Sequence, residues 1–291
     1  MMGVGHVEEK LLESGDFRGR TNILTTPNAM VSNFDISRKV LQLGTGVPGH
    51  ITFGIWEPTV QFTWRKVEMD TDMIGILWKK EHRSVSASGF KAIPISIEEN
   101  FFMERCRSIG RPDLIDMLLK SEVLKVPEDK LRSLRRLLML AVYCVELDDL
   151  AIIQMIEGDA VDLLIDSLLE TVPDPVVKDR TSHRFETVVD HIHNNIAEIT
   201  TVQQICNGTK IPERTLRRLI QDRYDISPKI YLNALRLNEV RKELKKGAEA
   251  TTVNYTAGLY NFWHMGQFTR DYKHLFGELP SETLTTTGVI R

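Results

Sequence analysis

The 291-residue sequence has few cysteines and no long apolar run. Its three cysteines, Cys106, Cys144 and Cys206, lie far apart among apolar neighbours, so we expect buried reduced thiols and no disulfide framework or CxxC-type metal site. No apolar run approaches the roughly 18 residues that a membrane-spanning helix needs, and residues 1–19 carry acids where a signal peptide has an apolar core. These absences predict a cytoplasmic protein that does not enter a membrane.

Motifs of catalysis are missing as well. A metal-dependent cupin enzyme needs several histidines and a carboxylate around one ion, but His50 and His82 stand alone in their region. His191 and His193 are two positions apart in a predicted helix and therefore lie on different faces. There is no Ser-His-Asp, P-loop or GxGxxG pattern, so we predict neither an enzyme nor a metal site.

The charges present are distributed unevenly along the chain. The formal net charge is −3, yet residues 171–291 contain 17 Lys and Arg against 14 Asp and Glu, a balance of +3. The remaining part has a balance of −6. Because Lys and Arg neutralise phosphates in nucleic-acid complexes, this asymmetry is compatible with a DNA-binding C-terminal part.

The first part of the chain changes from polar to strand-like to helical texture. Residues 1–27 are polar and irregular, which predicts a loosely attached arm. Residues 31–97 alternate apolar with polar positions between glycines and prolines, which predicts a small antiparallel barrel or sandwich. Apolar faces at helical spacing then continue from Leu131 to Leu169, and helices there would cover the sheet or pair with a second subunit.

Domain boundaries follow from the break at Pro173-Asp174-Pro175. We assign residues 1–170 to an N-terminal domain, 171–182 to a linker and 183–291 to a helical domain. The predicted helices of that last domain cover residues 183–194, 201–206, 212–220, 228–246, 252–259 and 264–276. Asn207-Gly208 is the predicted turn between the second and third, so short helix, turn and basic helix form a helix-turn-helix candidate.

A second helix-turn-helix candidate follows about 50 residues later. In its last helix Met265, Phe268, Tyr272 and Leu275 recur at steps of three and four and share one face. Gln267, Arg270 and Lys273 stay off that face. Such a helix buries one side and offers long polar side chains on the other, which suits the major groove of DNA.

Two helix-turn-helix units joined by one long helix resemble the DNA-binding domain of the AraC/XylS family of bacterial transcription regulators. The resemblance covers about residues 184–284. The runs that carry it are Arg214-Thr215-Leu216-Arg217-Arg218-Leu219, Ala234-Leu235-Arg236-Leu237-Asn238, Phe262-Trp263-His264-Met265-Gly266-Gln267-Phe268 and Leu275-Phe276-Gly277-Glu278-Leu279-Pro280-Ser281-Glu282.

The resemblance implies an α+β protein in which a cupin-like β-barrel sensor with covering or dimerisation helices precedes the all-α domain. It also implies a homodimer that binds promoter DNA, a small-molecule effector and RNA polymerase, more often as an activator. Three departures stand out. Asn261 replaces a glycine and tolerates the left-handed turn; Thr256 replaces an apolar residue and should weaken packing; Pro212 replaces a serine cap of the third helix.

The DNA-reading residues are assigned to the two basic helices, because residues near the N-terminal end of a recognition helix reach base edges while flanking Lys and Arg contact phosphates. In the first unit the candidates are Arg214, Thr215, Arg217, Arg218 and Gln221; in the second they are His264, Gln267, Arg270 and Lys273. The alternative is a merely solvated basic face.

A local pattern suggests the effector. The run Arg83-Ser84-Val85-Ser86-Ala87-Ser88-Gly89 resembles the (Asp/Asn)-x-Ser-x-x-Gly motif of PilZ receptors for cyclic di-GMP, with Ser84 where that family has Asp or Asn. Those receptors add two arginines four apart, for which Arg132 with Arg136 is the first choice, ahead of Arg107 with Arg111 and Arg180 with Arg184. Guanidinium groups stack on guanine and bind phosphate. The expected effector site therefore comprises Arg83, Ser84, Ser86, Gly89, Arg132 and Arg136.

Other functions stay open at this point. The effector could be another small metabolite, or a protein partner could control a regulator that binds no ligand. An enzyme with a cupin-like barrel on a DNA-binding tail is disfavoured by the missing histidine cluster.

Overall fold

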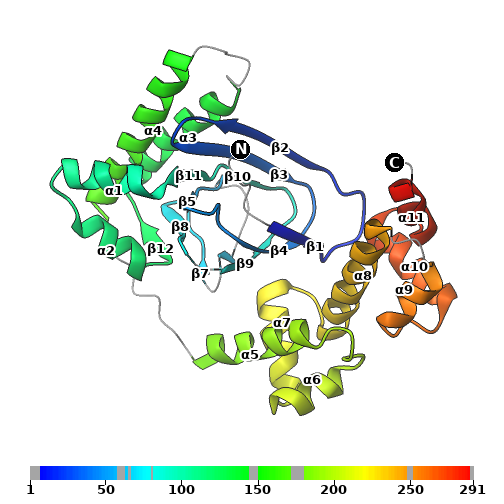
Figure 1. The fold of residues 1–291 in the computed structure, drawn as a ribbon. Coiled ribbons are helices and arrows are strands. Elements are labelled where there is room, and N and C mark those ends of the chain that lie inside the picture. The colour runs from blue at the N-terminus through cyan, green and yellow to red at the C-terminus, as the bar shows by residue number, and fades with distance from the viewer. Residues whose placement is uncertain are drawn as a thin grey trace. The chain divides into compact units, whose positions relative to one another are not determined.

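The computed structural model describes residues 7–57, 63–64, 67–79, 81–143, 150–171, 180–247 and 252–288. The chain divides into two compact units (Figure 1). Unit 1 consists of residues 1–9 and 18–176, and unit 2 of residues 10–17 and 177–291. Most of the predicted linker at 171–182 lies outside the described residues.

The described strands are antiparallel and form two sheets, and all but the last two residues of β1 belong to unit 1. One sheet has the order β1-β4-β9-β6-β7, and the other has the order β10-β3-β11-β5-β8-β12, with β2 also paired to β3. Their bounds are β1 Val7–Leu11, β2 Gly19–Thr25, β3 Ala29–Ile36, β4 Val40–Thr45, β5 His50–Gly54, β6 Thr63–Trp64, β7 Val67–Glu68, β8 Met73–Leu77, β9 Glu81–Ser86, β10 Phe90–Ala92, β11 Ile95–Glu98 and β12 Val123–Lys125. The predicted antiparallel β region is therefore present. The cupin-like barrel is not closed, because no ladder among the described strands joins the two sheets.

The expectation of a loose, irregular arm at residues 1–27 was wrong. β2 pairs with β3 over seven residues, from Gly19 opposite Ile36 to Thr25 opposite Met30. Most β2 side chains are exposed, which explains the polar sequence, since the pairing there is carried by the backbone.

Four helices complete unit 1: α1 Glu99–Ser108, α2 Asp113–Lys120, α3 Glu128–Tyr143 and α4 Leu150–Leu169. They enclose one apolar core with the larger sheet, to which Phe53 and Ile95 of the sheet and Leu134 of α3 contribute. Figure 1 shows α3 and α4 side by side beyond β2 and β3. The predicted covering role of these helices is confirmed.

A buried carboxylate ties α4 to the turn between β2 and β3. Glu157 accepts hydrogen bonds from the Thr26 hydroxyl and from the backbone and side-chain nitrogens of Asn28, the latter two at 2.8 Å. Because a buried charge is costly unless it is well hydrogen-bonded, this arrangement fixes the position of α4 against the hairpin.

Unit 2 is helical, as predicted. Its helices are α5 Arg180–Asn194, α6 Val202–Thr209, α7 Glu213–Tyr224, α8 Pro228–Lys246, α9 Val253–Leu259, α10 Met265–Phe276 and α11 Pro280–Gly288. The α6–α7 and α9–α10 pairs are joined by α8. Residues 10–17 also belong to this unit: the Asn238 amide of α8 bonds both the backbone N–H and the C=O of Leu11, and buried Lys10 pairs with Glu239.

The turn of the first helix pair was predicted at the wrong residues. Asn207 and Gly208 still belong to α6, and the left-handed residue is Lys210, with φ of 58°. Gly208 is needed for close approach, because a Cβ there would collide with the imidazole of His191 on α5. In the second pair the corresponding left-handed residue is Asn261, with φ of 60°, as predicted.

Two arginines of α8 hold the second helix pair. Arg236, 7% exposed, donates from Nε to the carbonyl of Tyr260 at 2.8 Å, and its guanidinium lies 4.3 Å from the ring centroid of Phe262. Arg241 pairs with Glu278 at 2.9 Å and lies 4.7 Å from the Phe276 ring centroid. The α8 helix therefore fixes both the turn before α10 and the turn after it.

Arg236→Ala should loosen the second helix pair. The change removes a charged hydrogen bond and a desolvated cation–π contact, so we expect the opening free energy of α9 and α10 to fall by about 2 to 3 kcal/mol. Amide hydrogen exchange measures this opening free energy directly. Arg218→Ala, on the exposed face of α7, is the control, and unchanged protection of α9 and α10 in Arg236→Ala would contradict this role.

Candidate nucleic-acid interface

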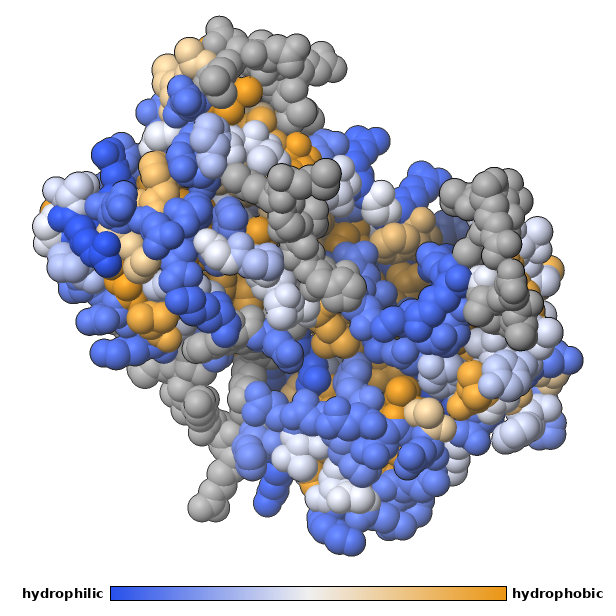
Figure 2. Space-filling model, in the orientation of Figure 1, coloured by the Kyte–Doolittle hydropathy of each residue, from blue (hydrophilic) through white to orange (hydrophobic). Residues whose placement is uncertain are grey.

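The α7 helix presents a continuous basic face. Its inner side buries Leu216, Leu219, Ile220 and Tyr224. The first-unit candidates lie on the other side, where Arg214, Arg217, Arg218 and Gln221 are exposed and Thr215 is half-buried. Figure 2 shows a largely hydrophilic surface over the region of α6 and α7. Sequence periodicity thus placed these side chains on the correct face.

Few contacts restrain these side chains. Arg217 pairs with Glu213 at 3.2 Å, one turn earlier, and Gln221 bonds Asp225 at 3.0 Å. Both contacts are on the surface, where an ion pair contributes little. Within the described part of the chain, neither Arg214 nor Arg218 has a hydrogen-bond or ion-pair partner. The face can therefore exchange its contacts for those of a ligand at low cost.

The α10 helix repeats this division with fewer charges. It buries Phe268, Tyr272, Leu275 and Phe276. The second-unit candidates His264, Gln267, Arg270 and Lys273 are all exposed. Arg270 donates to Gln267 at 2.9 Å, and Gln267 donates to Asp271 at 2.6 Å, so these three side chains form a surface network.

The three departures from the family pattern have structural answers. Pro212 begins α7 without any side-chain cap, as predicted, whereas Thr201 and Gln204 form a capping box at the start of α6. Thr256 is buried, but its hydroxyl bonds the Thr252 carbonyl at 2.9 Å, so no polar group is stranded in the packing of α9.

The proposed effector residues fall in separate places. Arg83, Ser84 and Ser86 are on β9 of the smaller sheet, where successive side chains alternate between faces. Ser84 is opposite Trp64 on β6 and bonds Gln42; Ser86 is fully buried and bonds the Val40 carbonyl. Arg83 is half-buried.

The remaining members lie elsewhere. Gly89 is in the turn before β10, at φ of 77° with open space around its Cα. Arg132 and Arg136 are exposed on α3, which packs on β2 and β3 of the larger sheet, and Arg132 pairs with Glu128 at 2.8 Å. The structure therefore does not bring the six residues together in one site. The residues stay apart because Ser84 and Ser86 are buried on β9 of the smaller sheet, whereas Arg132 and Arg136 lie on the surface of α3, which packs on the larger sheet.

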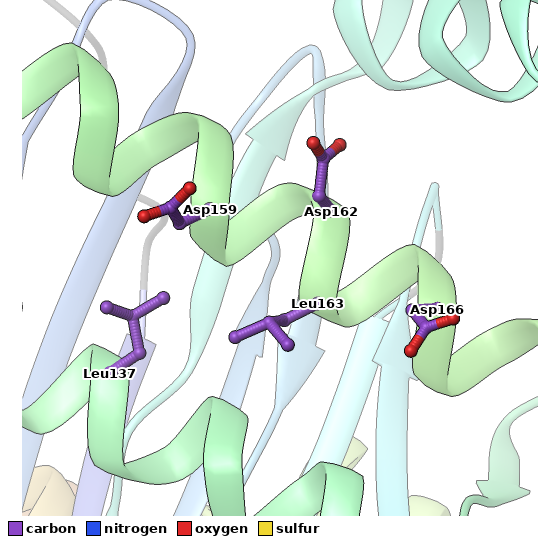
Figure 3. Close-up of a pocket in the computed structure, with 5 residues that line it drawn as sticks. All are labelled: Leu137, Asp159, Asp162, Leu163 and Asp166. Carbon is purple, nitrogen blue, oxygen red and sulfur yellow. The ribbon is translucent and has the colours of Figure 1, made fainter.

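An open groove of about 490 Å³ runs along α3 and α4 (Figure 3). Leu137 and Leu163 line its apolar part, and Asp159, Asp162 and Asp166 line its acidic part. Asp162 receives two hydrogen bonds from Arg105 of α1, and Asp166 pairs with Lys130 of α3 at 2.8 Å. Carboxylates in this groove would repel a phosphate, so it does not suit an anionic ligand.

Two further findings concern the described residues only. No group of three or more His, Cys, Asp or Glu side chains among them is arranged to hold a metal ion. None of the described helices is both long and apolar enough to cross a membrane.

Comparison with known proteins identifies the helical unit. Residues 205–286 match a family model described as a helix-turn-helix domain. The C-terminal unit contains a helix-turn-helix domain. The XylDLEGF operon transcriptional activator 3 of Pseudomonas putida is 27% identical over 150 residues, covering 50% of this chain and 45% of that protein. The probable thc operon regulatory protein of Rhodococcus erythropolis is 30% identical over 99 residues, covering 34% of this chain and 30% of that protein.

Among solved structures, a probable AraC family transcriptional regulator from Rhodopseudomonas palustris is 31% identical, covering 36% of this chain and 97% of that chain, with a TM-score of 0.34. The chain spans less than half the length of the first curated relatives it matches. The curated relatives named above are a transcriptional activator and a probable operon regulatory protein. The predicted helix-turn-helix resemblance is thereby confirmed.

Proposed function

We propose that this protein is a ligand-responsive, sequence-specific DNA-binding transcription regulator, and that it activates transcription by contacting RNA polymerase. The observation that carries the proposal is the pair of exposed polar faces on α7 and α10, each backed by a buried apolar face and held to one rigid helix, α8. The activator names of the homologues support the sign of regulation.

Each basic helix would read bases from its N-terminal part. Arg214, Arg217 or Arg218 can place two hydrogen bonds on guanine O6 and N7, and Gln267 can do the same on adenine. Thr215, Gln221, His264, Arg270 and Lys273 would complete the contacts to bases and phosphates. If α8 keeps the two pairs in fixed register, their recognition helices enter successive major grooves, about 34 Å apart on one side of promoter DNA.

Arg217→Ala tests base reading. The wild-type protein first selects its operator from a random duplex library. A lost bidentate contact should then weaken binding to that operator about 5- to 100-fold, and binding to unrelated DNA far less. Gel-shift titration at fixed salt gives both affinities. Lys120→Ala, at an exposed lysine of α2 in unit 1, is the control. Equal losses on both DNAs would show that Arg217 contacts phosphate only.

Ligand responsiveness is the second part of the proposal, with cyclic di-GMP as its first candidate effector. Of the six expected residues, Arg83 and Gly89 are the best placed to contact cyclic di-GMP. Ser84 and Ser86 are already hydrogen-bonded inside the sheet, and the exposed arginines of α3 lie elsewhere. Another small metabolite, or a protein partner acting without a ligand, are the alternatives.

Isothermal titration calorimetry with cyclic di-GMP tests this candidate. We expect saturable heat with the wild type and a loss of at least tenfold in affinity with Arg83→Ala, because a guanidinium contact to guanine or phosphate would be removed. Arg136→Ala separates the α3 arginines from the β9 arginine. An absence of heat with the wild type would end the cyclic di-GMP hypothesis and leave the DNA-binding proposal untouched.

Dimerisation through α3 and α4 is the third part. Leu140 of α3 is 63% exposed, and Met155 of α4 is 60% exposed, so apolar side chains remain on the outer surfaces of the two helices. The exposed Arg132 and Arg136 of α3 complement the aspartates of α4, which favours a second copy of the chain as the partner.

Leu140→Glu should shift the protein toward monomer, because it places a charge in the proposed interface. Analytical ultracentrifugation at several concentrations would show a dissociation constant raised at least tenfold. Leu119→Glu, at an exposed leucine of α2, is the matched control. A wild type that is monomeric at all concentrations would rule out dimerisation, and a Leu140→Glu variant with unchanged association would place the interface elsewhere.

A further inference from the structure

Trp263 is the most exposed large apolar side chain among the described residues, at 73%. It lies in the turn of the second helix pair, two positions before α10 begins. Its neighbour Phe262 turns inward, where its ring centroid lies 5.1 Å from that of Phe268 at a tilt of 48° and its face lies under Arg236. Because Phe262 is fixed in this way, the chain presents Trp263 to solvent.

The first helix pair has no equivalent of Trp263. There, the buried Leu216 follows the left-handed Lys210 by six positions, whereas the buried Phe268 follows the left-handed Asn261 by seven. The second turn is thus one residue longer. Pro212 directly precedes α7 just as His264 precedes α10, which leaves Trp263 as the extra residue.

Trp263 precedes α10 at its N-terminal end. Within the helix, the exposed Gln267 and Arg270 are three positions apart and lie on one side. Gly266 follows Trp263 by three positions and has no neighbouring atom within 4 Å of where a Cβ would lie. A duplex could therefore approach the backbone closely beside the indole.

The indole lies near α9 on one side. A Cβ built on Gly258 of α9 would lie 3.8 Å from ring atom Cζ3 of Trp263, and 73% of the Trp263 side chain is exposed. This leaves most of the ring surface in water, at the end of the helix that faces bases in a helix-turn-helix complex.

We infer that Trp263 is a specificity-determining residue of the second helix pair, and that it makes an apolar contact with the 5-methyl group of a thymine in the major groove. Thymine is the only DNA base that presents a methyl group there, and apolar side chains recognise it. The contact would supply sequence information that the sparse polar network of Gln267, Arg270 and Asp271 does not. The inference rests on the proposed DNA-binding function.

A thymine-to-uracil scan of the selected operator tests the inference, because uracil differs from thymine only by lacking the 5-methyl group. With wild-type protein, one position in the half-site read by α10 should lose roughly fourfold in affinity on substitution, the size expected for one buried methyl group. Trp263→Ala should bind the thymine operator at least as weakly as wild-type protein binds the uracil operator. Its affinity should not fall further when uracil replaces thymine at that position. Trp263→Phe should retain part of the preference for thymine.

Tyr255→Ala and Leu259→Ala, at exposed apolar residues of α9, are matched controls and should keep the full thymine preference. Circular dichroism verifies the fold of every variant. A Trp263→Ala protein that binds the thymine operator as tightly as wild type, or that shows the same uracil loss, overturns the inference. Failure of the proposed function has a different signature: no operator is selected from the random duplex library.

Discussion

The second helix pair depends on one buried charge, the guanidinium of Arg236. It donates a hydrogen bond to the carbonyl of Tyr260, the residue directly after α9, and covers the ring of Phe262. One side chain of α8 therefore fixes the turn between α9 and α10. Burial lowers the pKa of Arg236, yet an arginine stays charged well above neutral pH, so the contact persists under all ordinary conditions. The orientation of Gln267, Arg270 and Trp263 follows from this anchor.

Helical periodicity predicted the helices of unit 2 well, because its signal is local. The buried and exposed sides of α7 and α10 are those expected from residues three and four apart, and the left-handed turn at Asn261 followed from asparagine's tolerance of that conformation. The turn at Lys210 was missed, because a lysine gives no such local signal. Only packing reveals that Gly208 is a close-contact position of α6 and not a turn.

Unit 1 was predicted less completely because its decisive interactions are long-range. Strand alternation indicated antiparallel sheets, but whether the sheets close into a barrel depends on pairing that no single stretch encodes. The carboxylate of Glu157, which reaches the turn at Asn28, has no counterpart in any sequence pattern. A short motif such as that around Ser84 likewise says nothing about whether its side chains face solvent or the interior of the sheet.

Residues 10–17 have a practical bearing on how unit 2 can be isolated. The backbone of Leu11 and the ammonium of Lys10 satisfy Asn238 and Glu239 of α8, although they lie more than 200 positions earlier in the chain. A fragment cut at the boundary near residue 177 would keep every helix of the unit but strip one side of α8 of its hydrogen-bonding partners. A synthetic peptide of residues 10–17 supplied in trans would restore these partners, so this segment behaves toward α8 as a ligand that comes from its own chain.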